Sequence, residues 1–218
     1  MDFIRNEIRD GSLDYHLVKI LALELSSACG SLSWRDDDGN FTREWENDRK
    51  NCGEFFRNLA EVQKRFGPPE RIVVGLGPGS YAGTRIAISA AIGLQTASKA
   101  ELVGLSSLCA IDCAAPEYAV AGDARRQSFF LAQVHDNILC GRPELQSEAE
   151  LRTALDVLRT RMPIFASEDL PRFDAVSVRY SSAQILARLA QDTNRTFVSP
   201  PLEPMYLREP HITTPKRR

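Results

Sequence analysis

The first part of the chain alternates between short apolar runs and one stretch with helical spacing. Three of the apolar runs are bounded by turn-forming residues, as expected of strands, at 17–25, 29–34 and 41–45. Between 51 and 66, large apolar residues recur on one broad face of a helix, and Gly67-Pro68-Pro69 ends that helix. A further apolar run at 71–76 is typical of a buried strand.

A glycine-rich corner follows this strand and leads into a second helix. The corner comprises Gly77, Pro78, Gly79, Ser80 and Gly83. Glycine allows the backbone to turn sharply or to approach another group closely. From Thr84 to Ser98 the pattern is helical, and apolar or small residues occupy nearly every side. Such a helix must be covered on more than one face, and its own sheet covers only one of them.

The second half of the chain repeats this kind of order. Apolar runs predict further strands at 102–105, 118–121, 129–134 and 164–165. Helical spacing predicts helices at 107–114, 148–158 and 183–190. Two hairpin corners, Ser26-Ser27 and Asp123-Ala124, occupy comparable places in the two halves.

We therefore predict an α/β fold of two lobes, similar to the ribonuclease-H-like architecture of actin, hexokinase and Hsp70. In that architecture a nucleotide lies between the lobes. The predicted division is an N-terminal extension, a first lobe with the glycine corner, and a second lobe with a C-terminal tail, at 1–16, 17–100 and 101–218.

Composition narrows the possible functions. The chain carries 27 basic and 29 acidic residues, a balance that does not favour binding nucleic acid unaided. We expect free thiols buried in the core at most of the five cysteines, since none forms a CxxC pair. No apolar stretch reaches the roughly 20 residues that span a bilayer, and the polar N-terminus does not resemble a secretory signal. We expect a cytoplasmic protein with no membrane contact, no metal and no cofactor.

Three interpretations of the glycine corner compete. A Walker A loop is excluded because no lysine follows the glycines at the required spacing. Gly77, Gly79 and Ala82 fit a dinucleotide-binding pattern, but Glu101 precedes the next strand instead of ending it. The third interpretation is a structural corner that also binds a partner.

A family resemblance supports the third interpretation. GLGPGSYAGTRIAISAAIGL at 75–94 resembles the TsaB (YeaZ) signature, usually written GPGSFTGVRIG. Four further segments resemble the family in the same order: ILALELSSACGSLSW, VGLSSLCAI, AGDARRQSFFLAQV and PMYLRE. The resemblance extends from about Leu17 to Glu209. Glu24 departs from the family's usual Asp, and Tyr81-Ala82 from its usual Phe-Thr.

The resemblance implies a role in making threonylcarbamoyladenosine in tRNA. TsaB proteins resemble an inactive copy of TsaD, the transferase that holds a metal through two histidines on its first helix. The stretch 51–66 contains no histidine here, so the resemblance implies a non-catalytic subunit that binds and stabilises TsaD. The ATPase TsaE would join the assembly, and tRNA would be contacted only through it. A homodimer through the same surface is expected in isolation.

The family docks with TsaD through the first two helices, which implies an interface here at Phe55, Phe56, Leu59, Val62, Arg85, Ala87, Ala90, Ala91 and Leu94. A vestigial nucleotide cleft would use Glu24, Ser26 and Asp123. The alternative function is a small-molecule kinase or ATPase of the same superfamily that uses this cleft. A lone Asp123 after Gly122 is also a common turn residue.

Overall fold

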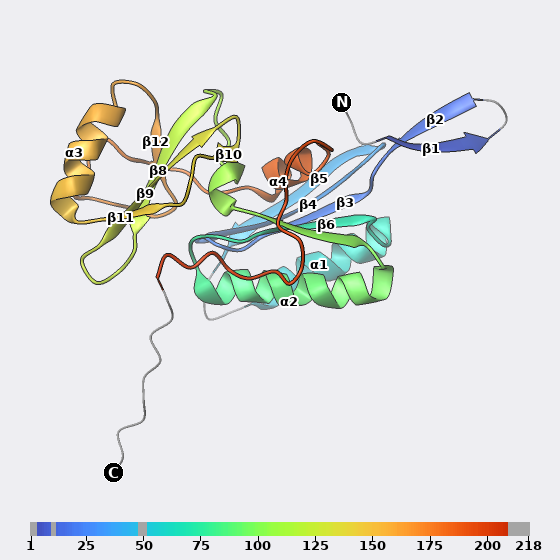
Figure 1. Ribbon diagram of the computed structural model, residues 1–218. Coiled ribbons are helices and arrows are strands. Elements are labelled where there is room, and N and C mark those ends of the chain that lie inside the picture. The colour runs from blue at the N-terminus through green and yellow to red at the C-terminus, as the bar shows by residue number, and fades with distance from the viewer. Residues whose placement is uncertain (1–3, 10–11, 48–51, 209–218) are drawn as a thin grey trace, which may run out of the picture.

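The computed structural model describes residues 4–9, 12–47 and 52–208. It contains two lobes, each built on a mixed β-sheet, and a β-hairpin that projects from the first lobe (Figure 1). The sheet of the first lobe has the strand order β5-β4-β3-β6-β7. Its strands are β3 (Ile20–Glu24), β4 (Cys29–Asp36), β5 (Gly39–Glu46), β6 (Arg71–Gly75) and β7 (Glu101–Leu105).

Helices cover both faces of this sheet. Alternate residues of β3 point to opposite faces, so Leu21 and Leu23 belong to one core cluster and Ile20 and Ala22 to another. The first cluster lies under α1 (Gly53–Phe66) and α2 (Tyr81–Ser98). The second lies under α4 (Ala183–Leu189), a helix from the far end of the chain.

The sheet of the second lobe repeats the same strand order, β10-β9-β8-β12-β13. In both sheets the first three strands are antiparallel and the last two run parallel to the first. The strands are β8 (Glu117–Asp123), β9 (Phe129–His135), β10 (Ile138–Leu139), β12 (Ile164–Ala166) and β13 (Ser177–Val178), with β11 (Glu144–Gln146) also paired to β9. Helix α3 (Glu148–Leu158) corresponds to α1, whereas residues 167–176 replace α2 by a loop. The predicted two-lobed α/β fold is confirmed.

The lobes divide the chain differently from the predicted boundary between residues 100 and 101. Strand β7 pairs with β6 and completes the first sheet, because a strand–helix–strand crossover through α2 returns the chain beside β6. Helix α4 packs on the first sheet as well, although it lies in the predicted second lobe.

Several predicted elements differ in length or type. Helix α1 begins at Gly53, and residue 51, where the helix was predicted to start, lies outside the described residues. The predicted helix at 107–114 is a single 3-10 turn, η1 (Ser107–Ala110). The predicted N-terminal extension contains an antiparallel hairpin of β1 (Ile4–Arg9) and β2 (Ser12–Leu17).

The cysteines are all free, but only Cys109 is buried. Cys29 and Cys113 are half-buried, and Cys52 and Cys140 are exposed, so the prediction of buried thiols was wrong for most of them. Within the described ranges, no helix is long and apolar enough to cross a membrane.

Candidate functional site

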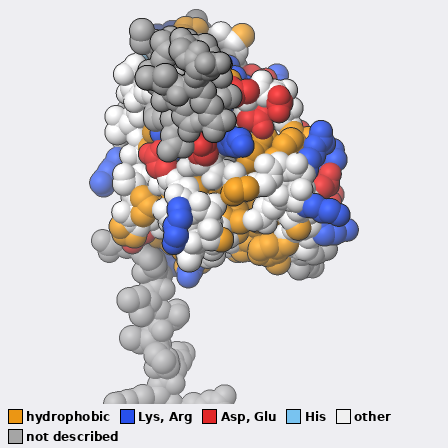
Figure 2. Space-filling model, turned by 90° about the vertical axis from the view of Figure 1, so that its right-hand side faces the viewer, with side chains coloured by type: hydrophobic (Ala, Val, Ile, Leu, Met, Phe, Trp, Pro, Cys, Tyr) orange, Lys and Arg blue, Asp and Glu red, His pale blue; other side chains and the backbone are white. Residues whose placement is uncertain are grey.

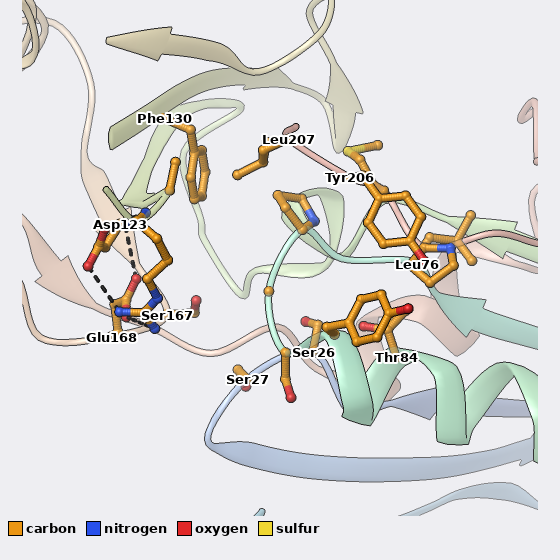
Figure 3. A pocket seen from close by; sticks show the side chains of 18 of the residues that line it. Ser26, Ser27, Leu76, Thr84, Asp123, Phe130, Ser167, Glu168, Tyr206 and Leu207 are labelled. Atoms are coloured by element: carbon orange, nitrogen blue, oxygen red, sulfur yellow. Dashed lines mark hydrogen bonds and ion pairs between the residues drawn. The ribbon is translucent and has the colours of Figure 1, made fainter. Parts of the chain in front are cut away.

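A cavity of about 340 Å³ lies between the two lobes and is the candidate functional site. Ser26, Ser27 and Thr84 lie on its first-lobe side, and Asp123, Ser167 and Glu168 lie opposite them (Figure 3). The structure thus brings together two of the three residues predicted for the cleft, Ser26 and Asp123. The third, Glu24, does not line the cavity.

The glycine corner forms the first-lobe wall of this cavity. The Gly77–Pro78 peptide bond is cis, and the Gly77 N–H donates to the Ser107 hydroxyl at 2.9 Å. The Ser80 N–H donates to the Ser26 carbonyl at 2.5 Å, and the Ser80 hydroxyl caps α2 by accepting from the Gly83 N–H. The bond between Ser80 and Ser26 holds the start of α2 against the β3–β4 turn.

Two glycines allow this contact to be close. A Cβ added at Gly79 would lie 2.1 Å from the Ser26 carbonyl oxygen, and one at Gly83 would lie 2.1 Å from the Leu25 carbonyl oxygen. Gly79 also has a φ of 157°. Since both neighbours are backbone atoms that cannot rotate away, the corner requires glycine at both positions.

Glu24 lies buried beneath the corner, with none of its surface exposed. Its Oε1 accepts a hydrogen bond from the Ser26 N–H at 2.7 Å, while Oε2 has no partner among the described residues. A Cβ at Gly75 would lie 1.8 Å from Oε2, so this glycine makes room for a side chain one methylene longer than the aspartate usual in the TsaB family.

Burial raises the pKa of the Glu24 carboxyl above its ordinary value of 4.5, although the neighbouring polar groups of Ser107 and Ser26 oppose the rise. The neutral acid is therefore the form that the fold favours. Because it is buried and does not line the cavity, the Glu24 carboxyl is not accessible to a ligand there.

The second-lobe wall of the cavity is an ionic cluster at the end of β8. The Asp123 N–H donates to Glu168 Oε1 at 2.9 Å, and the Arg125 N–H donates to Asp123 Oδ1 at 2.6 Å. The Arg125 guanidinium lies 3.0 Å from Asp123 Oδ2 and 3.8 Å from Glu168 Oε2. Asp123 thus closes the turn and pairs with Arg125, as expected of a turn residue.

Residues 204–208 of the C-terminal segment form the third wall, a position that was not predicted from the sequence. The Met205 N–H donates to the Leu76 carbonyl at 2.7 Å, and the Tyr206 ring lies 5.6 Å from that of Tyr81. Arg85 donates to the Tyr81 hydroxyl. Tyr206 belongs to the PMYLRE segment that resembles the family, which was the available signal. Phe130, which also lines the cavity, belongs to the segment AGDARRQSFFLAQV, which resembles the family as well, whereas Glu168 had no such signal.

The predicted partner interface is partly buried inside the chain. Phe55, Leu59, Val62, Ala87 and Ala91 are core residues of the first lobe, because the inward faces of α1 and α2 pack on their own sheet. Of the remaining predicted residues, Phe56 and Arg85 are exposed and Ala90 and Leu94 are half-buried. A hydrophobic area bordered by Lys and Arg side chains is also exposed at one end of the molecule (Figure 2).

Replacing Gly83 by alanine tests the close contact at the corner. We expect Gly83→Ala to lower the free energy of unfolding by about 2 kcal/mol, because the added methyl group meets the Leu25 carbonyl. Gly93→Ala in the same helix is the matched control, since a Cβ there meets no atom within 4 Å. The control should gain about 1 kcal/mol from helix propensity. Urea denaturation measures the free energy of unfolding of both variants. Equal changes in the two variants would contradict the close contact at Gly83.

The pH dependence of stability tests the buried acid. The pKa of Glu24 is raised in the folded state. Its contribution to stability is therefore complete below about pH 4.5 and is lost as the pH rises through the pKa of the folded protein. At a pH above the folded-state pKa of Glu24, we expect the Glu24→Gln variant to have a Tm at least about 2 °C higher than that of the unsubstituted protein. The difference should vanish at lower pH. Glu44→Gln, at an exposed position of β5, is the control. A Tm difference that does not change with pH would show that the pKa of Glu24 is not raised in the folded protein.

Part of the chain matches a known protein family. Residues 55–150 match the family model for TsaD, described as tRNA N6-adenosine threonylcarbamoyltransferase. This range includes most of α1, the glycine corner, α2 and the β8–β9 hairpin. A comparison with curated protein sequences gave no match.

Two solved structures share the fold. One is an uncharacterized protein with similarity to peptidase YEAZ from Pseudomonas aeruginosa, at 21% identity and a TM-score of 0.71, over 88% of this chain and 100% of that one. The other is YeaZ from Pseudomonas aeruginosa, at 18% identity and a TM-score of 0.62, over 80% of this chain and 91% of that one.

Among the described residues, no group of three or more His, Cys, Asp or Glu side chains could hold a metal ion. A TsaD-type segment thus lies within a fold shared with YeaZ, and together these findings confirm the resemblance of the chain to the TsaB (YeaZ) family.

Proposed function

We propose that this chain is a non-catalytic subunit of a tRNA threonylcarbamoyladenosine-modifying complex, in which it binds and stabilises a TsaD-type transferase. The match of residues 55–150 to the TsaD family model and the fold shared with YeaZ support a role in forming threonylcarbamoyladenosine in tRNA. The exposed side of α2 supports the binding role.

The composition of α2 is the observation that carries this proposal. Its 18 residues include one charged side chain, Arg85. Ala87 and Ala91 are fully buried on the sheet, yet Ile92 on the outer side is 47% exposed and Gly93 has open space around it. Apart from Arg85, the exposed positions of α2 are uncharged, and most of them are small or apolar. Surface helices normally carry a charged or strongly polar outer face, so this composition supports the presence of a partner that covers it.

Helix α1 packs on the same face of the first sheet as α2. Phe56, which is 49% exposed, lies on α1 beside the buried Phe55, with ring centroids 5.0 Å apart. An exposed aromatic next to a helix with small outward residues provides both an anchor and a flat surface for close approach. This is the surface on which we place the helices of TsaD.

The charge balance is consistent with indirect contact with tRNA. A formal net charge of −2 provides little general attraction to phosphates, so the transferase would supply most of the tRNA-binding surface. TsaE would join the same assembly. In the absence of TsaD, the exposed side of α2 would favour a homodimer.

Co-purification with TsaD from the same organism tests the proposal. We expect a stable complex on sizing, and tRNA modification only when this chain is present. Failure to associate, with nucleotide added, would contradict it. ATP turnover by the purified chain alone would instead favour the small-molecule kinase or ATPase alternative.

A single substitution on the outer side of α2 tests the interface. We expect Ile92→Glu to weaken binding to TsaD at least about tenfold, because an unpaired carboxylate would be buried. Val157→Glu is the matched control, since Val157 is a hydrophobic residue of α3 with 57% exposure. Ala91 is unsuitable for this test, because its burial would turn any charged replacement into a test of folding. Unchanged affinity of Ile92→Glu would exclude this face.

A further inference from the structure

The turn between β8 and β9 has an unusual backbone that the proposed function does not use. Arg125, Arg126 and Gln127 have φ values of 65°, 55° and 60°, so three consecutive residues other than glycine are left-handed. The turn is closed by Ala124 N–H donating to Ser128 at 2.9 Å and Ser128 N–H donating to Arg125 at 3.2 Å. Left-handed conformations are costly for residues with a Cβ.

Contacts among the described residues do not explain why Arg126 occupies this position. Arg125 is held by Asp123 and Glu168. The exposed side chain of Arg126 makes no ion pair or hydrogen bond with any described residue. Glycine would fit the same backbone with less strain. Strain without a compensating contact indicates a functional position.

The turn forms one side of a recess of about 290 Å³. The opposite side is the loop that replaces the equivalent of α2 in the second lobe. Three buried residues, Phe129, Leu170 and Phe173, supply apolar surface to the lining. The two phenylalanine rings meet edge to face at 5.0 Å, which fixes that surface.

Two opposite charges line the recess without partners. Arg172 is paired with Glu148 at 2.7 Å, and Asp123 is paired with Arg125. Arg126 and Asp169 remain, and neither makes an ion pair or hydrogen bond with any described residue. A complementary ligand presents an anion to the guanidinium, an N–H donor to the carboxylate, and an apolar group to the phenylalanines.

We propose that this recess binds an apolar amino-acid residue through its α-carboxylate, either as the free amino acid or as the last residue of a peptide chain. The planar guanidinium of Arg126 suits a carboxylate, which it can bind through two parallel hydrogen bonds. Asp169 accepts from the amine of a free amino acid or from the amide N–H of a chain end. The volume lies at the lower limit for small-molecule pockets, which suits a single residue.

Calorimetric titration of the full chain tests this assignment with L-leucine, L-phenylalanine, N-acetyl-glycyl-L-leucine and L-leucinamide. Binding of the free amino acids alone would identify them as the source, and binding of the acetylated dipeptide would identify a chain end. Leucinamide, which lacks the carboxylate, should not bind. No heat from any carboxylate ligand at about 10 mM, a concentration that detects a Kd near 1 mM, would overturn the proposal.

Arg126→Gly separates a ligand contact from a structural role. We expect this variant to raise Tm, because it relieves the left-handed strain, and to weaken ligand binding at least about tenfold. Arg142→Gly, at another exposed arginine, should leave binding unchanged. Undiminished binding by Arg126→Gly would overturn the assignment. Binding of a single-stranded oligoribonucleotide that is lost in the same variant would also overturn it, because the cation would then serve phosphate.

Discussion

The close approach between the start of α2 and the β3–β4 turn is the constraint on which the rest of the site depends. Gly79 and Gly83 bring the helix against the carbonyl oxygens of Ser26 and Leu25 at distances that exclude any side chain. This contact sets the position of α2 on its sheet. It therefore also sets which residues of α2 face outward and which hydroxyl groups line the cavity.

The two lobes share a strand order, but the segments that follow corresponding strands differ. In the first lobe, the strand that follows the first helix leads through the glycine corner into α2, whose outer side carries the exposed Ile92. In the second lobe, the equivalent strand β12 leads into a loop that carries Glu168 and Asp169. The loss of one helix there opens a recess and gives the cavity a charged wall opposite a wall of hydroxyl groups.

Much of this fold could be predicted from apolar patterns. Two halves with similar order account for the strands, the glycine corner and the placement of Ser26 and Asp123 in the lining of one cavity. The inward face of α1 could also have been predicted, since its large apolar residues should pack on their own sheet. Periodicity does not orient α2 in the same way, because nearly every side of that helix is apolar.

Other features have no local signal. Pairing of β7 with β6 depends on the path of the crossover, and the cavity contacts of Glu168 depend on a loop from a distant part of the chain. Arg125, Arg126 and Gln127 are not residue types that favour positive φ, so the left-handed turn could not be expected from them.

The path of the C-terminal segment has a consequence for synthesis of the protein. Helix α4 covers one face of the first sheet, Val198 pairs with Gly104 of β7, and Leu202 lies in the first-lobe core. Leu207 then packs against the core of the second lobe. The first lobe therefore cannot be completed until the ribosome has translated α4, Val198 and Leu202. Until then, the nascent first lobe exposes an apolar sheet face, and exposed apolar surface of this kind favours aggregation unless another protein covers it.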